Sequence, residues 1–191
     1  VLYPTVDDKY YTLAELKEAI ATNQTDKNGK LVVLYASNKD AQHSYIEIAK
    51  EKGYQVLLLD SPIVSHLIQK LEADNENLTF TRVDSDHIEK LIQKEETQIS
   101  KLSEDESTQL KTVLEEIVPK TNYSVQLEPL DSTAAPFIIT QPEFMRRMKE
   151  MSQSGGGGMF GMGNFPEMYN LVVNTNSDLA TTILNTDDKS A

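Results

Sequence analysis

The stretch Leu31-Val32-Val33-Leu34-Tyr35-Ala36 (LVVLYA) is a continuous apolar run that contains β-branched residues. Such an unbroken run is typical of a strand that is buried on both faces of a parallel sheet. A second run of this kind, Tyr54 to Leu59 (YQVLLL), follows a predicted helix at about 40–52, and Gly53 stands where a helix C-cap glycine belongs. The two runs therefore predict the centre of a small parallel sheet.

Helical signals surround these two strands. Thr12 and Glu15 have the spacing of a capping box and predict the start of a first helix. Pro62 stands where the first residue of another helix is expected, and residues 78–83 (LTFTRV) predict a third strand. The alternation of strands and helices predicts a small three-layer α/β unit with a short parallel sheet over residues 1–83.

The pattern changes at about Asp84, and we predict a second domain over residues 84–191. Up to Lys120 the signals are helical, with Ser103 and Glu106 forming a capping box. Ile88, Leu91 and Ile92 start one predicted helix, with Ile99 and Leu102 further on. Strands are predicted at 123–127, 136–139 and 169–174. Asn176 or Ser177 is expected to cap a last helix. The predicted fold class is therefore α/β followed by α+β, the second part being helix-rich with a small three-stranded sheet.

All six methionines and three of the five phenylalanines lie in the stretch 140–168, TQPEFMRRMKEMSQSGGGGMFGMGNFPEM. Thr140 precedes Glu143 by three residues, as in a capping box, and Pro142 fits a first helical turn. Phe144, Met148 and Met151 recur on one helical face. The four glycines at 155–158 lose too much entropy on ordering to form regular structure. The stretch therefore predicts a short amphipathic helix that leads into an apolar loop.

A stripe of Met and Phe at helical spacing is more often part of a core. However, a core helix rarely runs directly into polyglycine with another apolar cluster beyond it. Residues 1–141 carry a net charge of −10 and residues 142–176 a net charge of zero, so the stripe is a neutral island on an acidic chain. We interpret it as an adaptable surface for binding proteins. Its candidate residues are Phe144, Met145, Met148, Met151, Met159, Phe160 and Met162.

The composition restricts the remaining functional classes. The net charge of −12 argues against a nucleic-acid partner, because phosphate contacts need clustered Lys and Arg. No apolar run is long enough to span a membrane. The chain has no cysteine, which fits a reducing compartment, and it has no signal-peptide pattern, so we expect a cytoplasmic location. It also begins without Met, which predicts a fragment or a processed product.

Catalytic and metal sites are not predicted. Asp60 follows a predicted parallel strand, where α/β proteins place ligands, but we interpret it as a turn or cap residue. The three histidines show no metal-ligand spacing. An α/β enzyme that uses the strand ends near Ser37 and Asp60 stays the weakest alternative, because the expected convergent polar groups are not visible in the sequence. We therefore predict no catalytic residue, no cofactor and no metal in this chain.

Four stretches of the sequence resemble the heat-shock protein 90 family of molecular chaperones in its bacterial type. KLVVLYASNKD and GYQVLLLDSPIVSHLIQKLE resemble the end of that family's middle domain. LEPLDSTAAPFIITQPEFMRRMKEM and YNLVVNTNSDLATTIL resemble its C-terminal domain. The resemblance implies that residues 1–83 belong to the middle domain and residues 84–191 to the domain for dimerisation and client contact, without its final helices.

The resemblance also implies that the parent protein is a homodimeric, ATP-dependent chaperone that uses ATP and Mg, and that its nucleotide site lies outside this chain. In the family, the helix that corresponds to 142–152 is implicated in contact with non-native client proteins. The matching positions here are Phe144, Met148 and Met151, with Met145 beside them. The alternative is a structural oligomerisation module whose stripe docks terminal helices or a second protomer.

Overall fold

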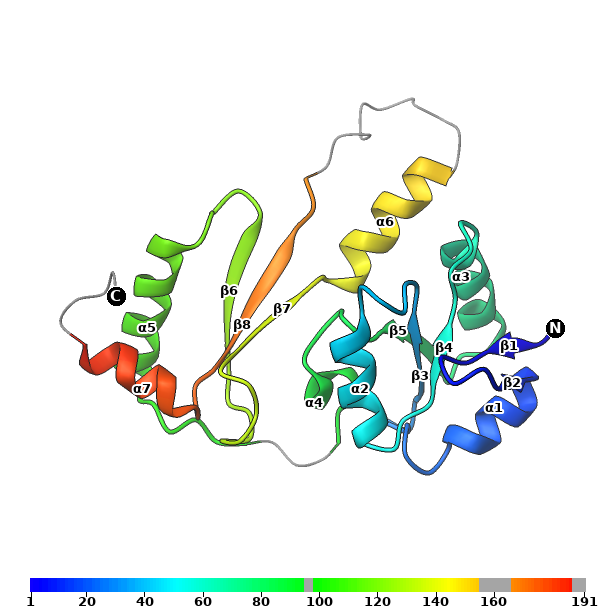
Figure 1. The fold of residues 1–191 in the computed structure, drawn as a ribbon, viewed down its shortest axis with the longest axis horizontal. Helices are drawn as coiled ribbons and strands as arrows, with labels where there is room; N and C mark the ends of the chain where they lie inside the picture. Colours follow the sequence, from blue (N-terminus) through cyan, green and yellow to red (C-terminus); the bar gives the residue numbers. More distant parts are fainter. Residues whose placement is uncertain (95–97, 155–165, 187–191) are drawn as a thin grey trace. The chain divides into compact units, whose positions relative to one another are not determined.

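The computed structural model describes residues 1–94, 98–154 and 166–186 (Figure 1). The chain divides into two compact units. The first comprises Val1–Glu95 and Glu143–Phe165, and the second comprises Glu96–Pro142 and Pro166–Ala191. Across the described residues, no helix combines the length and the apolar character that crossing a membrane requires.

The first unit is built on a parallel three-stranded sheet with β3 (Leu31–Ala36) at its centre. β4 (Val56–Leu58) and β5 (Leu78–Arg82) pair with its two edges. Successive β3 side chains enter opposite cores: Val33 lies in one and Leu34 in the other. The prediction of a parallel strand that is buried on both faces is therefore confirmed at β3.

Helices cover both faces of this sheet (Figure 1). α1 (Leu13–Ile20) and α3 (Val64–Asp74) supply Leu16, Ile20, Val64 and Ile68 to the core that contains Val33. α2 (His43–Glu51) and α4 (Ile88–Leu91) supply Ile46, Ala49 and Leu91 to the opposite core. The capping box between Thr12 and Glu15 is present at the start of α1. Gly53, just beyond α2, has a φ of 76°, the left-handed conformation that favours glycine.

Three features of the first unit differ from the expectations. α3 begins at Val64 rather than at Pro62, and the side chain of Ile63 is 63% exposed. The helix predicted to continue towards Ile99 ends at Leu91, because the buried Ile92 has an extended backbone. The short antiparallel pair of β1 (Tyr3–Pro4) and β2 (Tyr10–Tyr11) was not predicted, since two-residue strands leave no periodic signal.

The second unit contains another three-stranded sheet, in the order β6-β8-β7. The central strand β8 (Tyr169–Asn174) pairs in parallel with β6 (Tyr123–Glu128) and antiparallel with β7 (Phe137–Thr140). α5 (Glu104–Ile117) and α7 (Asp178–Asn185) share a core with the sheet. That core contains Leu110, Leu114, Val125, Val173 and Ala180. The predicted caps at Ser103 and Ser177 are both present.

Buried asparagines connect the loops of the second unit. Asn174 is fully buried, and its side chain donates to the carbonyl of Asp131 and accepts from the amide of Leu130. Asn176 donates to the carbonyls of Ile99 and Leu130. These bonds satisfy backbone groups that the loops would otherwise bury unpaired, so they hold the end of β8 in place.

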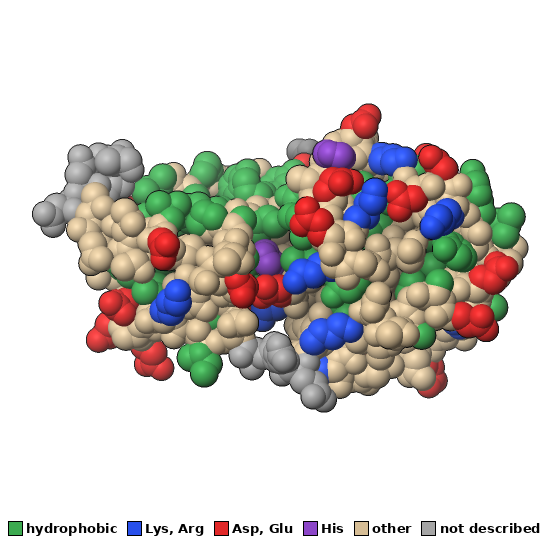
Figure 2. Space-filling view, turned by 60° about the horizontal axis from the view of Figure 1, so that its bottom comes forward, with side chains coloured by type: hydrophobic (Ala, Val, Ile, Leu, Met, Phe, Trp, Pro, Cys, Tyr) green, Lys and Arg blue, Asp and Glu red, His purple; other side chains and the backbone are tan. Residues whose placement is uncertain are grey.

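Figure 2 shows Lys and Arg side chains interspersed with Asp and Glu over the right-hand part of the surface. On that face the charges of the acidic chain are therefore mixed.

The assignment of residues 1–83 and 84–191 to two domains of a larger protein stays a prediction.

Candidate functional site

The helix α6 (Glu143–Ser154) carries the candidate stripe, and the compact first unit includes it. Its charged residues Glu143, Arg146, Arg147 and Glu150 recur at i, i+3, i+4 and i+7, which places them on one face. That face contacts the sheet and α3, and the Arg146 side chain is only 5% exposed. The helix is therefore anchored through its charged face, the reverse of the usual arrangement for an amphipathic helix.

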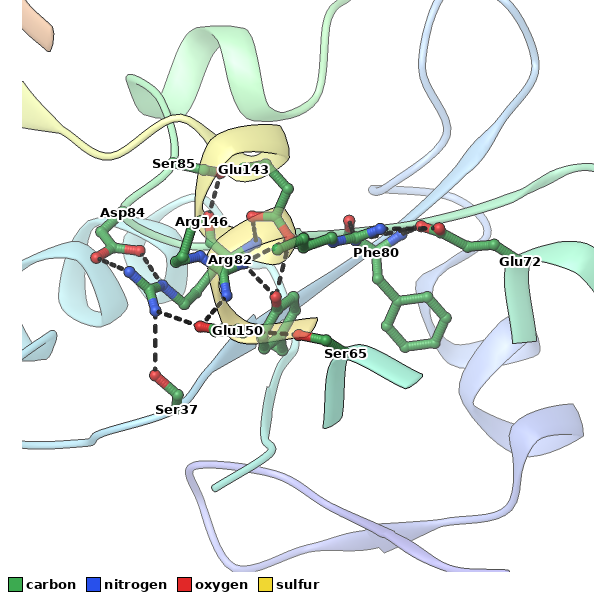
Figure 3. Close-up of polar contacts among 12 residues, drawn as sticks. Ser37, Ser65, Glu72, Phe80, Arg82, Asp84, Ser85, Glu143, Arg146 and Glu150 are labelled. Atoms are coloured by element: carbon green, nitrogen blue, oxygen red, sulfur yellow. Dashed lines mark hydrogen bonds and ion pairs between the residues drawn. The ribbon is translucent and has the colours of Figure 1, made fainter. Parts of the chain in front are cut away.

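Glu143 is the centre of the anchor (Figure 3). One carboxylate oxygen accepts a hydrogen bond from the Tyr35 hydroxyl at 2.8 Å and also pairs with Arg146 and Arg147, each at 2.7 Å. The other oxygen accepts from the backbone amide of Arg82 at 3.1 Å. These charge-assisted bonds join the first turn of α6 to β3 and β5.

The two arginines extend the anchor in different directions. Arg146 donates to the Tyr35 hydroxyl and to Glu150, and its guanidinium lies 5.7 Å from the centre of the Tyr35 ring. Arg147 donates to Glu72 of α3 at 2.9 Å and to the carbonyl of Phe80 at 2.6 Å. Their planar, five-donor geometry allows each guanidinium to join several acceptors.

Glu150 fixes the second turn of the helix. It accepts a hydrogen bond from the hydroxyl of Ser65 in α3 at 2.5 Å and lies 4.0 Å from Arg82. Arg82 itself forms a two-pronged pair with Asp84, at 2.5 and 3.0 Å. The anchor therefore continues from α6 into the residues that follow β5 (Figure 3).

Burial and neighbouring charges set the ionisation of the anchor. Burial raises the pKa of the Tyr35 hydroxyl far above its ordinary value, and Glu143 adds to the shift, so the hydroxyl stays a donor. Burial alone would raise the pKa of Glu143, but Arg146 and Arg147 outweigh it and hold that pKa below its usual range. Burial acts to lower the pKa of both arginines, yet the neighbouring carboxylates raise it overall.

The opposite face of α6 is apolar and exposed. Phe144 is 71% exposed, Met148 47% and Met145 42%. Met151 is half-buried. The structure thus brings four of the candidate residues together on one short helix, three of them open to solvent. Met159, Phe160 and Met162 lie outside the described residues.

The capping box predicted between Thr140 and Glu143 is wrong. Thr140 is the last residue of β7, and α6 begins at Glu143, so the threonine is too far from the helix to act as its N-cap. The Thr140 hydroxyl is buried without a hydrogen-bond partner among the residues that the structure describes. Glu143 binds Tyr35 and the arginines instead.

The anchor itself was not predicted from the sequence. Two signals could have indicated it. One is the recurrence of two acidic and two basic residues at helical spacing from Glu143 to Glu150, which gives a charged face able to pair with other elements. Tyr35 also stands in an otherwise apolar strand, and a buried Tyr hydroxyl needs a hydrogen-bond partner.

A cavity of about 410 Å³ opens beside the anchor, at the carboxyl ends of β3 and β4. Ser37 and Asp60, the two strand-end residues of the enzyme alternative, both line it. Arg146 and Glu150 line it too, but each already engages partners of the anchor. Arg146 and Glu150 therefore serve to hold α6, and we assign no reaction to the cavity.

The similar proteins that we compare with the chain are all HtpG chaperones. No model of a known protein family matches the chain. The chain is 41% identical over 190 residues to the chaperone protein HtpG of Bacteroides thetaiotaomicron and 40% identical over 191 residues to that of Bacteroides fragilis. It is also 40% identical over 192 residues to the HtpG of Porphyromonas gingivalis. These alignments cover 98 to 99% of the chain but only 28% of each relative.

Proposed function

This chain belongs to the HtpG family of chaperone proteins, the bacterial type of the heat-shock protein 90 family, and we propose that it binds non-native client proteins through the exposed face of α6. The client surface consists of Phe144, Met145, Met148 and Met151, and Met159, Phe160 and Met162 extend it in sequence. The observation that carries the proposal is the exposure of a large apolar face on a helix whose charged face is anchored.

The chemistry of this surface suits many partners. Methionine side chains are flexible and polarizable, so one set of them can adapt to different apolar segments. Phe144 adds a rigid aromatic ring, a residue type that contributes strongly to protein contacts. Large apolar side chains that are grouped and open to solvent are typical of sites where proteins bind one another.

The anchor supports this function by fixing the helix before a client arrives. Glu143, Arg146 and Arg147 connect α6 to three other elements of the first unit. A surface that is already ordered loses less conformational entropy on binding. At about 25 cal/mol per Å², a buried apolar area of a few hundred Å² contributes several kcal/mol before the costs of association. Binding of this size is weak and reversible, as a chaperone of many clients requires.

The remaining properties are proposed for the whole protein, of which this chain matches about a quarter of the length. We propose that it is an ATP-dependent, homodimeric chaperone of the cytoplasm that uses ATP and Mg. We do not assign a nucleotide site, a catalytic residue or a metal to this chain.

The test is suppression of aggregation. The chain is mixed with thermally unfolded citrate synthase as the probe, and light scattering is followed with the native sequence and with Met148→Asp combined with Met151→Asp. We expect the double variant to fold, as judged by circular dichroism, and to lose suppression. A folded double variant that suppresses as well as the native chain contradicts the proposal.

Leu179→Asp is a matched control. Leu179 is 41% exposed, close to the exposure of Met145, and it lies in the first turn of α7, where a carboxylate is favoured. This variant should suppress aggregation like the native chain. Sedimentation of the same proteins separates client binding from the assembly alternative, because dimers that depend on Met148 and Met151 would favour an oligomerisation module.

A further inference from the structure

The sulfur chemistry of the chain is concentrated at one place. The sequence has no cysteine, and its six methionines all lie between positions 145 and 168. Two of them, Met145 and Met148, are 42% and 47% exposed on the apolar face of α6. Susceptibility of a thioether to oxidants follows its accessibility to solvent. Oxidation of sulfur in this chain is therefore confined to the segment 145–168, and Met145 and Met148 are exposed to it on α6.

We propose that Met145 and Met148 are reversible oxidation sites, at which conversion to the sulfoxide releases bound clients; this inference rests on the proposed function. The oxidant is a hydroperoxide. The thioether sulfur attacks the protonated oxygen of the peroxide, and the S–O bond forms as the O–O bond breaks. The proton of the attacked oxygen passes to the departing oxygen, which leaves as water or an alcohol. The sulfur is oxidised by two electrons and the peroxide is reduced by two.

Oxidation changes the property on which client contact depends. A sulfoxide carries a strong S–O dipole that is hydrogen-bonded to water, so covering it with an apolar client costs desolvation free energy. The side chain at 148 lies in the middle of the exposed face, between Phe144 and Met151 in the helical repeat. A polar group at position 148 therefore divides the apolar surface, whereas one at the edge would only make it smaller.

The anchor is insulated from this reaction. The side chains of the anchor contain no sulfur. Glu143, Arg146, Arg147 and Glu150 point away from the exposed methionines. The sulfoxides are therefore expected to leave α6 in place and alter only what it presents. Oxidation at these two residues is therefore expected to change binding without unfolding the helix. Oxidation of a methionine buried in a core would instead disrupt the packing of that core.

The reverse step needs a reductant from another molecule, because the chain has no thiol of its own. Enzymes of the methionine sulfoxide reductase class supply it: two thiols become a disulfide, and the sulfoxide oxygen leaves as water. The two epimers of each sulfoxide require two such enzymes.

The first experiment maps the sites. The chain is treated with graded hydrogen peroxide and digested, and the gain of one oxygen at each methionine is followed by mass spectrometry. We expect Met145 and Met148 to react faster than the half-buried Met151. Oxidation of Met151 before both of them overturns the assignment.

The second experiment measures the consequence with two reciprocal variants. One replaces Met145 and Met148 by Leu, which keeps the face apolar but removes the reactive sulfurs. The other replaces the remaining four methionines by Leu, so that only Met145 and Met148 can be oxidised. Peroxide should raise the concentration of the second variant needed for half-maximal suppression roughly tenfold or more, and that of the first by much less. Both sulfoxide reductases together should restore the second variant.

The outcomes separate the two proposals. Full suppression by the second variant after both sulfurs are shown to be oxidised overturns the oxidation proposal and leaves client binding standing. Absence of suppression by the untreated native chain instead overturns the proposed function. Circular dichroism and hydrogen exchange of α6 are measured on the oxidised protein, and loss of the helix would contradict the insulation of the anchor.

Discussion

The hydroxyl of Tyr35 donates a hydrogen bond to the carboxylate of Glu143 at 2.8 Å, although 108 residues separate them in the sequence. Tyr35 lies on the central strand β3, and Glu143 is the first residue of α6. The same hydroxyl accepts a hydrogen bond from Arg146. The orientation of α6, which carries the proposed client surface, therefore depends on the hydroxyl of Tyr35 in the core beside the parallel sheet.

We predict that Tyr35→Phe destabilises the chain by about 1 to 3 kcal/mol, because buried groups of Glu143 and Arg146 each lose a hydrogen-bond partner while the ring remains. Urea unfolding followed by circular dichroism measures the change. Tyr10→Phe is the matched control, since Tyr10 is 63% exposed, and it should stay within about 0.5 kcal/mol of the native chain. Equal effects of the two substitutions would show that the Tyr35 hydroxyl is not a structural partner.

The second prediction concerns the charge of Glu143. Glu143→Gln removes the negative charge that Arg146 and Arg147 share. We expect it to cost on the order of 3 kcal/mol, since both largely buried guanidiniums lose a carboxylate partner and keep only one each. Hydrogen exchange should show the loss of protection concentrated in α6.

Glu115→Gln is the control for this charge change. Glu115 pairs with Lys111 at 3.9 Å on the exposed face of α5, and an exposed pair of this kind contributes little. Its removal should alter the free energy of unfolding by no more than about 0.5 kcal/mol. A loss of stability at Glu143→Gln as small as this would mean that the anchor is dispensable.

The third prediction is a dependence of stability on pH. The pKa of Glu143 is lower in the folded chain than its ordinary value of 4.5, so the unfolded chain binds the proton more readily. Its contribution to stability is complete above that ordinary pKa and is lost as the pH falls through the lowered pKa. The native chain should therefore lose more stability than Glu143→Gln between about pH 6 and about pH 3. Urea titrations of both proteins across this range provide the measurement, and parallel curves would contradict the prediction.

The sequence predicted those parts of the fold that depend on neighbours along the chain. The apolar run at β3, the capping boxes at Thr12 and Ser103, and the glycine after α2 are local patterns, and the structure has all of them. α4 ended early because the core required Ile92 in an extended conformation, which periodicity does not record. The exposed stripe was visible at helical spacing, but the partner of Glu143 was not, because it lies on a distant strand.

The last prediction follows from the misplaced cap. Ser103 caps α5, accepting a hydrogen bond from the amide of Glu106 at 3.3 Å, so Ser103→Ala should cost about 1 kcal/mol. Thr140 has the same sequence spacing before Glu143, but its buried hydroxyl has no partner in the described part of the chain. Thr140→Val replaces that hydroxyl with a methyl group of similar shape and keeps the β-branched side chain that suits a strand.

We therefore expect Thr140→Val to leave the free energy of unfolding unchanged or to raise it by up to about 1 kcal/mol, because an unsatisfied polar group is removed from the interior. Urea unfolding of the two variants beside the native chain makes the comparison. If Thr140→Val destabilised the chain as much as Ser103→Ala does, we would conclude that the Thr140 hydroxyl has a hydrogen-bond partner in solution. The original prediction that Thr140 caps α6 would then stand again. Changes of opposite sign in the free energy of unfolding would show that the same residue spacing can have two structural outcomes. Which outcome occurs depends on whether the first residue caps a helix or ends a strand.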